Sequence, residues 1–142
     1  MSSIQKRIKK VRTEIQHEWQ KRWWQFILDN PDKPWDWCGI SENPNLTMKF
    51  INDNPEKPWN WLAISDNPNI IIEDINDNPD KDWDWNWISC NPGITMKDIN
   101  NNHELPWKWN WISSNPNITM EFINDNPDKP WNWYCISRNK FT

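Results

Sequence analysis

The sequence predicts an all-α fold: an α-solenoid of about five 24-residue repeats, each made of two short helices, with an N-terminal capping helix. Two observations carry this prediction. Tryptophan recurs at a spacing of 24 residues in two columns, and Asn-Pro pairs divide the repeats into two short elements. A fixed period of about 20–50 residues is typical of solenoids. We therefore divide the chain into residues 1–28, the capping helix that merges into a first half-repeat, and residues 29–142, one continuous repeat array.

Three apolar columns define the predicted core. Short helices are marginal alone, so these columns must stack on their neighbours to stabilise the array. Serine follows the isoleucine in every repeat, which indicates a crowded site where its hydroxyl bonds a backbone carbonyl. The columns are Trp35, Trp59, Trp83, Trp107 and Trp131; Trp37, Trp61, Trp85, Trp109 and Trp133; and Ile40, Ile64, Ile88, Ile112 and Ile136.

The N-terminal segment predicts one amphipathic helix. Its apolar residues recur every three or four positions, and Phe26-Ile27 aligns with Phe50-Ile51 of the next repeat. We expect this apolar stripe to cover the open end of the stack. The stripe consists of Ile4, Ile8, Val11, Ile15, Trp19, Trp23 and Phe26.

The first element of each repeat is expected to begin near Asp32 and to end at Ser41, before Asn43-Pro44. Trp37, Ile40 and Ser41 share one face of an α- or 3₁₀-helix, although the Trp-x-Trp alternation leaves a strand as the alternative. An acidic column at its start is expected to cap it, with cation binding as the other interpretation. That column is Asp32, Glu56, Asp80, Glu104 and Asp128.

The second element runs from Leu46 to Asp53 and is about two helical turns long. Thr47 is a suitable helix cap, and Leu46, Phe50 and Ile51 fall at helical spacing. The residue before each proline is pushed out of the α region, so both elements end at Asn-Pro.

Charge is distributed unevenly along the chain. Residues 1–28 hold seven Lys/Arg and two Glu, a net +5, whereas residues 29–142 hold nine Lys/Arg and eighteen Asp/Glu, a net −9. An acidic array is a poor ligand for phosphates, so nucleic acid is not an expected partner. No apolar run reaches the ~20 residues of a membrane span, and we expect a cytoplasmic protein without membrane association.

The sequence contains no recognisable catalytic motif. Two glycines cannot form a phosphate loop, three cysteines form no Cys-x-x-Cys pair, and His17 and His103 lie far apart. We therefore expect no catalytic residue, no cofactor, no metal ion and no enzymatic activity.

Two sets of residues are candidates for an interaction surface. One column varies between repeats, while its neighbours do not: Cys38, Leu62, Asn86, Asn110 and Tyr134. Trp87 and Trp111 replace the smaller residues of the other repeats. These two rings either anchor a protein or stack on a sugar, or they are buried and fill a gap.

The stretch from Asn115 to Ser137, Asn-Pro-Asn-Ile-Thr-Met-Glu-Phe-Ile-Asn-Asp-Asn-Pro-Asp-Lys-Pro-Trp-Asn-Trp-Tyr-Cys-Ile-Ser, resembles the tryptophan-rich repeat arrays of giant DNA viruses that infect amoebae and other protists. The resemblance covers residues 26–139 and implies a viral protein that acts in the host cytoplasm or is carried in the virion. The period and the Ile-Ser before each break also look like leucine-rich variant repeats, which alternate an α- and a 3₁₀-helix. The iron–sulfur cysteine cluster of that family is missing here.

These features together predict a non-enzymatic repeat scaffold that mediates protein–protein interaction. Two alternatives remain: a self-assembling, virion-associated structural protein that forms a homo-oligomer, and a glycan-binding module that uses exposed Trp87 and Trp111.

Overall fold

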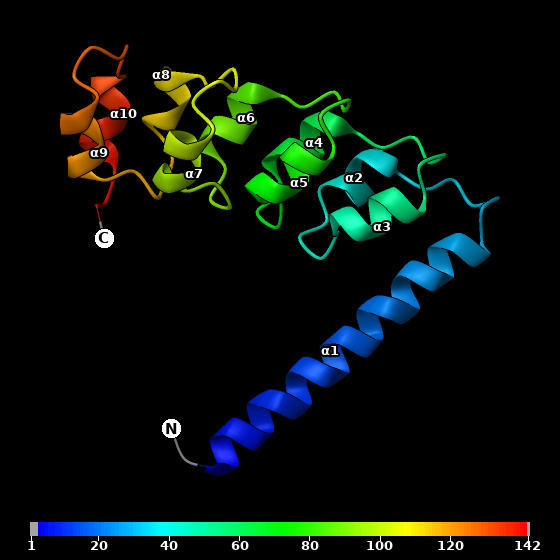
Figure 1. Ribbon diagram of the computed structural model, residues 1–142. Coiled ribbons are helices and arrows are strands. Elements are labelled where there is room, and N and C mark those ends of the chain that lie inside the picture. The colour runs from blue at the N-terminus through cyan, green and yellow to red at the C-terminus, as the bar shows by residue number, and fades with distance from the viewer. Residues whose placement is uncertain (1–2, 142) are drawn as a thin grey trace. The chain divides into compact units, whose positions relative to one another are not determined.

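The computed structural model describes residues 3–141, except for the side chains of residues 16 and 17. In this part of the chain all regular elements are α-helices, arranged in a repeating pattern that confirms the predicted all-α solenoid (Figure 1). The chain divides into two compact units, Met1–Trp35 and Asp36–Thr142. The helices are α1 (Ser3–Asp29), α2 (Trp37–Ser41), α3 (Met48–Asp53), α4 (Trp61–Asp66), α5 (Ile72–Asp77), α6 (Trp85–Cys90), α7 (Met96–Asn101), α8 (Trp109–Ile112), α9 (Met120–Asp125) and α10 (Trp133–Arg138).

The first unit consists of α1, an uninterrupted helix of 27 residues, and the turn that follows it. The rings of Trp23 and Phe26 meet Trp35 edge to face, with centroids 6.1 and 6.0 Å away. The indole nitrogen of Trp35 donates a hydrogen bond of 2.8 Å to the carbonyl of Asn30. The end of α1 thus provides the aromatic contacts of a half-repeat. That the apolar stripe of α1 covers the end of the stack stays a prediction.

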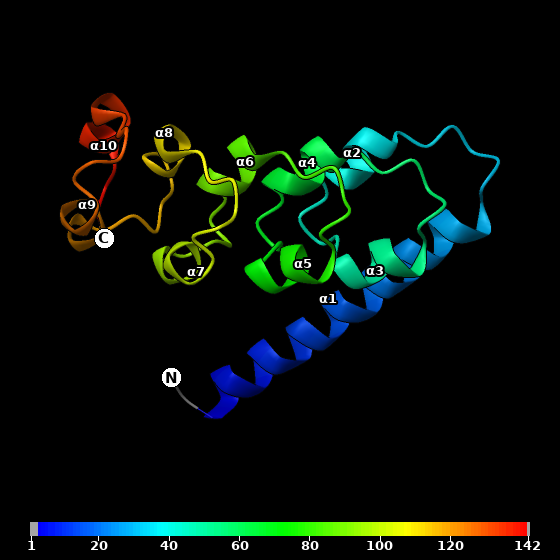
Figure 2. The same ribbon diagram turned by 45° about the horizontal axis from the view of Figure 1, so that its top comes forward.

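The second unit alternates helices of two kinds, which form two rows (Figure 2). The tryptophan row contains α2, α4, α6, α8 and α10, and neighbouring members of this row pack on one another from α2 through α8. The second row contains α3, α5, α7 and α9. Of the α and 3₁₀ alternatives left open by the sequence, the structure has α-helices in both rows.

The helices of the tryptophan row begin later than the sequence predicts, and the acidic column does not cap them. Their N-caps lie four residues after that column, and the side chains of Asp36, Asn60, Asp84 and Asn132 accept hydrogen bonds from the first turn. Asp32 lies instead in a turn closed by a hydrogen bond from Lys33 N to Asn30 O. Pro31 occupies the second position of this turn, where its fixed φ is favourable. The prediction failed because this turn and Pro34 occupy the expected first helical turn.

The second row follows the sequence prediction more closely. The hydroxyls of Thr47, Thr95 and Thr119 accept hydrogen bonds from the third residue of α3, α7 and α9. Each of these helices has six residues, which agrees with the expected two turns. The C-cap asparagines leave the α region, as expected for residues that precede proline or stand in its column.

The core lies between the two rows. The isoleucine column of the tryptophan row is buried, with exposed fractions between 0 and 9%. The residue before the N-cap of each second-row helix forms a further buried column that the sequence analysis did not place in the core: Leu46, Ile70, Ile94 and Ile118. Trp133 departs from the expected core because its ring is 64% exposed, whereas Trp83, Trp107 and Trp131 are buried. Among the described residues, no following first-column ring covers Trp133 in the way that later repeats cover its equivalents.

The two tryptophan columns form one joint between repeats. Four rings of the second column, all except Trp133, meet edge to face the first-column ring of the next repeat at 5.0–5.3 Å, as Trp37 meets Trp59. The first-column indole N–H donates to a C-cap carbonyl of the second row, as Trp59 does to Asn54. Lysines complete three joints, with Lys57, Lys81 and Lys129 over the second-column rings at 4.7–6.0 Å. Such offset geometries suit the charge distribution of aromatic rings.

A buried polar ladder runs beside this aromatic joint. The hydroxyl of Ser65 donates to Trp61 O at 2.7 Å and accepts from the backbone N–H of Asp84, 19 residues later. The side chain of Asn91 donates to the carbonyls of Ser65 and Asn67 at 2.8 and 2.9 Å, and its own oxygen accepts from Gly93 N. Ser41, Ser89 and Ser113 and the asparagines of the same column repeat the pattern. Backbone groups at the joint are therefore satisfied by the side chains of the next repeat.

Candidate interaction surface

The variable column occupies one position on each helix of the tryptophan row, the second residue of the helix. Cys38, Leu62, Asn110 and Tyr134 are exposed and Asn86 is half-buried. Leu62 and Tyr134 are the large members, with exposed fractions of 52 and 70%. In the same helices the isoleucine and serine columns face the core, and all of their members except Ser137 are buried. The row therefore presents residues that differ between repeats and buries residues that do not.

Trp87 and Trp111 lie side by side on α6 and α8, and both are half-buried. Their ring centroids are 5.6 Å apart and their planes are inclined by 56°. Each ring therefore covers part of the other and keeps some surface for solvent. This arrangement combines the two sequence interpretations, because the pair fills space between adjacent helices and still borders the surface.

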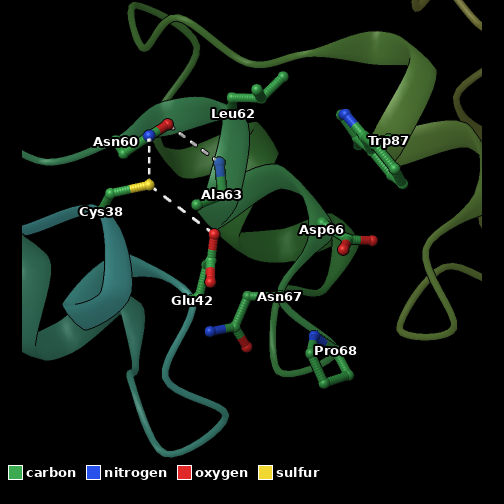
Figure 3. Close-up of a pocket in the computed structure, with 9 residues that line it drawn as sticks. All are labelled: Cys38, Glu42, Asn60, Leu62, Ala63, Asp66, Asn67, Pro68 and Trp87. Carbon is green, nitrogen blue, oxygen red and sulfur yellow. Dashed lines mark hydrogen bonds between the residues drawn. The ribbon is translucent and has the colours of Figure 1, made fainter.

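A pocket of about 330 Å³ opens on the tryptophan row, between α2, α4 and α6. Figure 3 shows Leu62 and Asp66 from α4, Trp87 from α6 and Glu42, the C-cap residue of α2, around it. Its remaining lining residues are Cys38, Asn60, Ala63, Asn67 and Pro68. Two of the predicted surface residues, Cys38 and Leu62, and one of the predicted tryptophans thus meet at one site.

Hydrogen bonds fix the side of the pocket formed by α2 and α4. Asn60 caps α4 by accepting from Ala63 N at 3.2 Å, and its amide nitrogen lies 3.1 Å from the Cys38 sulfur. The Cys38 thiol in turn donates to Glu42 Oε1 at 3.7 Å (Figure 3). This chain of contacts joins two repeats and holds Glu42 at the edge of the pocket.

The pocket is acidic. Burial raises the pKa of the Asp66 carboxyl above its ordinary value, and the negative charge of Glu42 raises it further. Burial also raises the pKa of the neighbouring Cys90 thiol to about 11, with smaller contributions from the charges of Asp66 and Asp84. Ion pairs do form elsewhere in the described residues, but neither Glu42 nor Asp66 takes part in one of those.

Sequence analysis did not single out Glu42 and Asp66. The signal was available, because the residue after the Ile-Ser pair varies in the same way as the predicted surface column. Its members are Glu42, Asp66, Cys90, Ser114 and Arg138. The two carboxylates matter because the helix turn places them next to Cys38 and Leu62, one turn earlier on the same face.

The other polar candidates remain scattered. His103 is exposed and lies 3.7 Å from Glu104, and the side chain of His17 lies outside the described residues. Within the part of the chain that the structure describes, no group of three or more His, Cys, Asp or Glu side chains is arranged to hold a metal ion. The helices in that part are also too short or too polar to cross a membrane.

Comparison of the chain with protein-family models, with curated proteins and with solved structures gives no match.

Proposed function

We propose that this chain is a non-enzymatic repeat scaffold that binds a protein partner through the exposed face of its tryptophan row. One observation carries the proposal: within the same short helices, the exposed position varies from repeat to repeat, while the buried positions stay the same. Packing accounts for the constant columns. Differences between repeats at an exposed column give such an array a surface with a specific pattern.

The residues of this face suit protein recognition. Leu62 and Tyr134 are large and exposed, and Trp87 borders the pocket with part of its ring accessible. Aromatic residues set in a polar surround are typical anchors of protein interfaces. From the resemblance to giant-virus arrays, we expect the partner in the host cytoplasm or in the virion.

The test compares two surface variants with the parent chain. The first changes the face of the tryptophan row by Cys38→Ser, Leu62→Ala and Tyr134→Ala. The control changes three exposed residues at the same helical position in the second row, by Lys49→Ala, Glu73→Ala and Lys97→Ala. Proteins captured from cells are identified by mass spectrometry, and the affinity of a purified candidate is then measured by calorimetry.

We expect the candidate to bind the parent and the second-row variant alike and to bind the tryptophan-row variant at least tenfold more weakly, because hot-spot residues carry most of the affinity. Circular dichroism establishes that all three chains are folded. Equal affinity for both variants would rule out the tryptophan row as the binding face.

Self-assembly is a second candidate, favoured by the opposite net charges of residues 1–28 and 29–142. Its signature is a molar mass in light scattering that rises with protein concentration and falls with salt, since screening weakens attraction between exposed charges.

The glycan interpretation requires an open ring face at Trp87 or Trp111. Protection of both rings from acrylamide quenching would argue against it.

A further inference from the structure

The pocket between α2, α4 and α6 combines an apolar wall with two carboxylates. Leu62, Ala63 and the ring of Trp87 form the wall, and Glu42 and Asp66 supply the charge (Figure 3). Its volume of about 330 Å³ lies within the range of ligand-binding pockets and greatly exceeds that of one water molecule. A ligand that fits must present an apolar part and a positive charge together.

The charges around the two carboxylates favour a positively charged ligand. Partial burial raises the pKa of Asp66, and repulsion from the charge of Glu42 raises it further. The charges that raise the pKa values of these groups are acidic: Glu42 acts on Asp66, and Asp66 and Asp84 act on Cys90. A bound cation would lower the energy of both carboxylates, as an opposite charge within a few ångströms does.

The array already places cations on its tryptophans. Lys57, Lys81 and Lys129 lie over the rings of Trp37, Trp61 and Trp109, with the nitrogen 4.7–6.0 Å from the ring centroid. The alkyl stem of such a side chain covers apolar surface while its charged end stays near water or carboxylates. The accessible part of Trp87 could receive a cation from outside in the same way.

We propose that this pocket binds an arginine or lysine side chain from a basic segment of the protein partner, with the stem against Leu62 and Trp87 and the charge at Asp66 and Glu42. This inference deepens the proposed function and rests on it. Arginine fits better, because its planar group both stacks on an indole ring and bonds carboxylates with two N–H groups.

The experiment uses the full chain and two short peptides. One is acetyl-Gly-Ser-Arg-Ser-Gly-amide, and its twin carries citrulline, a neutral group of nearly the same shape, in place of arginine. Nuclear magnetic resonance follows the backbone signals of residues 62–66 and the indole N–H of Trp87 during titration. We expect saturable shifts at these positions with the arginine peptide, and an affinity about tenfold lower for the citrulline twin.

Variants assign the effect to the pocket. Asp66→Asn and Glu42→Gln are each expected to weaken the arginine peptide several-fold, whereas Asp77→Asn, an exposed acidic residue on α5, leaves it unchanged. Equal binding of the two peptides, shifts spread over the acidic surface, or no shifts at all would overturn the proposal. The proposed function would survive that result if the variant of the tryptophan row still loses its partner, so the two failures can be told apart.

Discussion

At the residue scale, the array depends on buried polar side chains that form hydrogen bonds with the backbone of the preceding repeat. Asn91 is fully buried, donates to two carbonyls of the preceding repeat and accepts from Gly93 N. A buried polar group that loses its partner costs about 1–3 kcal/mol. The asparagine that ends one helix is therefore also the residue that aligns one repeat with the next.

Asn91→Ala should lower the free energy of unfolding by about 3 kcal/mol, because several buried backbone groups lose their partners at once. Urea unfolding followed by circular dichroism measures this loss. Asn139→Ala is the matched control: it belongs to the same column, is half-buried and donates to the single carbonyl of Asn115. Its loss should be about 1 kcal/mol. Equal losses for the two variants would mean that the buried ladder adds nothing beyond an ordinary hydrogen bond.

Cys90 should be the slowest of the three cysteines to react with iodoacetamide at pH 8. Its pKa of about 11 leaves only about one thiol in a thousand ionised at that pH, and the thiolate is the nucleophile. Mass spectrometry of tryptic peptides measures the three rates. The free energy of unfolding should depend on pH in the matching way. The thiol of Cys90 ionises at a lower pH in the unfolded chain than in the folded chain. Its stabilising contribution is therefore complete at pH 7 and is lost as the pH rises from about 9 towards 11. Rapid alkylation of Cys90 in the folded chain would contradict the raised pKa that its half-buried position gives this thiol.

At the element scale, the joint between repeats rests on an indole that both packs and donates. Trp59 meets the rings of Trp37 and Phe50 edge to face and donates to Asn54 O at 2.9 Å. Trp59→Phe keeps an aromatic ring but removes the donor, so we expect a loss of about 1–2 kcal/mol. Trp59→Ala removes both and should cost about 3–5 kcal/mol.

Trp133→Phe provides the control for that series, since this ring is 64% exposed and its replacement should change stability by less than about 0.5 kcal/mol. Chemical unfolding of the four chains gives the comparison. If Trp59→Phe costs as much as Trp59→Ala, the ring that Phe retains adds nothing, which would contradict a joint that rests on ring packing as well as on the hydrogen bond.

The sequence predicts where the helices of the second row begin. It also predicts that the tryptophan row is helical, but it does not predict the residues at which those helices begin. Thr47 is both a cap and the first residue before an apolar pattern, so local chemistry and periodicity agree. Asp32 is an equally good cap by composition, but Pro31 and Pro34 build a turn there and Asp36 takes the cap position. Two competing cap residues four positions apart cannot be ranked by propensity alone.

The candidate pocket was only partly predictable, for a different reason. Cys38, Leu62 and Trp87 stand out because they differ from their columns, and the structure places all three at the pocket. Glu42 and Asp66 look like ordinary surface carboxylates in the sequence. Their proximity follows from the stacking of α2 on α4, which is a relation between repeats that no single repeat encodes.

At the scale of the whole molecule, the second unit repeats one joint, so its length should be adjustable in steps of one period. Solenoid stability is approximately a sum over repeats and their interfaces.

Deleting residues 73–96 joins Ile72 to Lys97 and keeps all the columns in register. We expect a folded chain that unfolds cooperatively in urea, with a lower midpoint and a slope reduced by roughly a fifth, because less surface becomes exposed. Deleting residues 85–96 instead removes half a period and joins the Asp84 cap to Lys97, the second residue of α7. That chain loses Trp85, Ile88 and Asn91 together and should lose the near-ultraviolet signal of packed tryptophans. If both deletions unfold alike, the joint between repeats is not the unit that stabilises this fold.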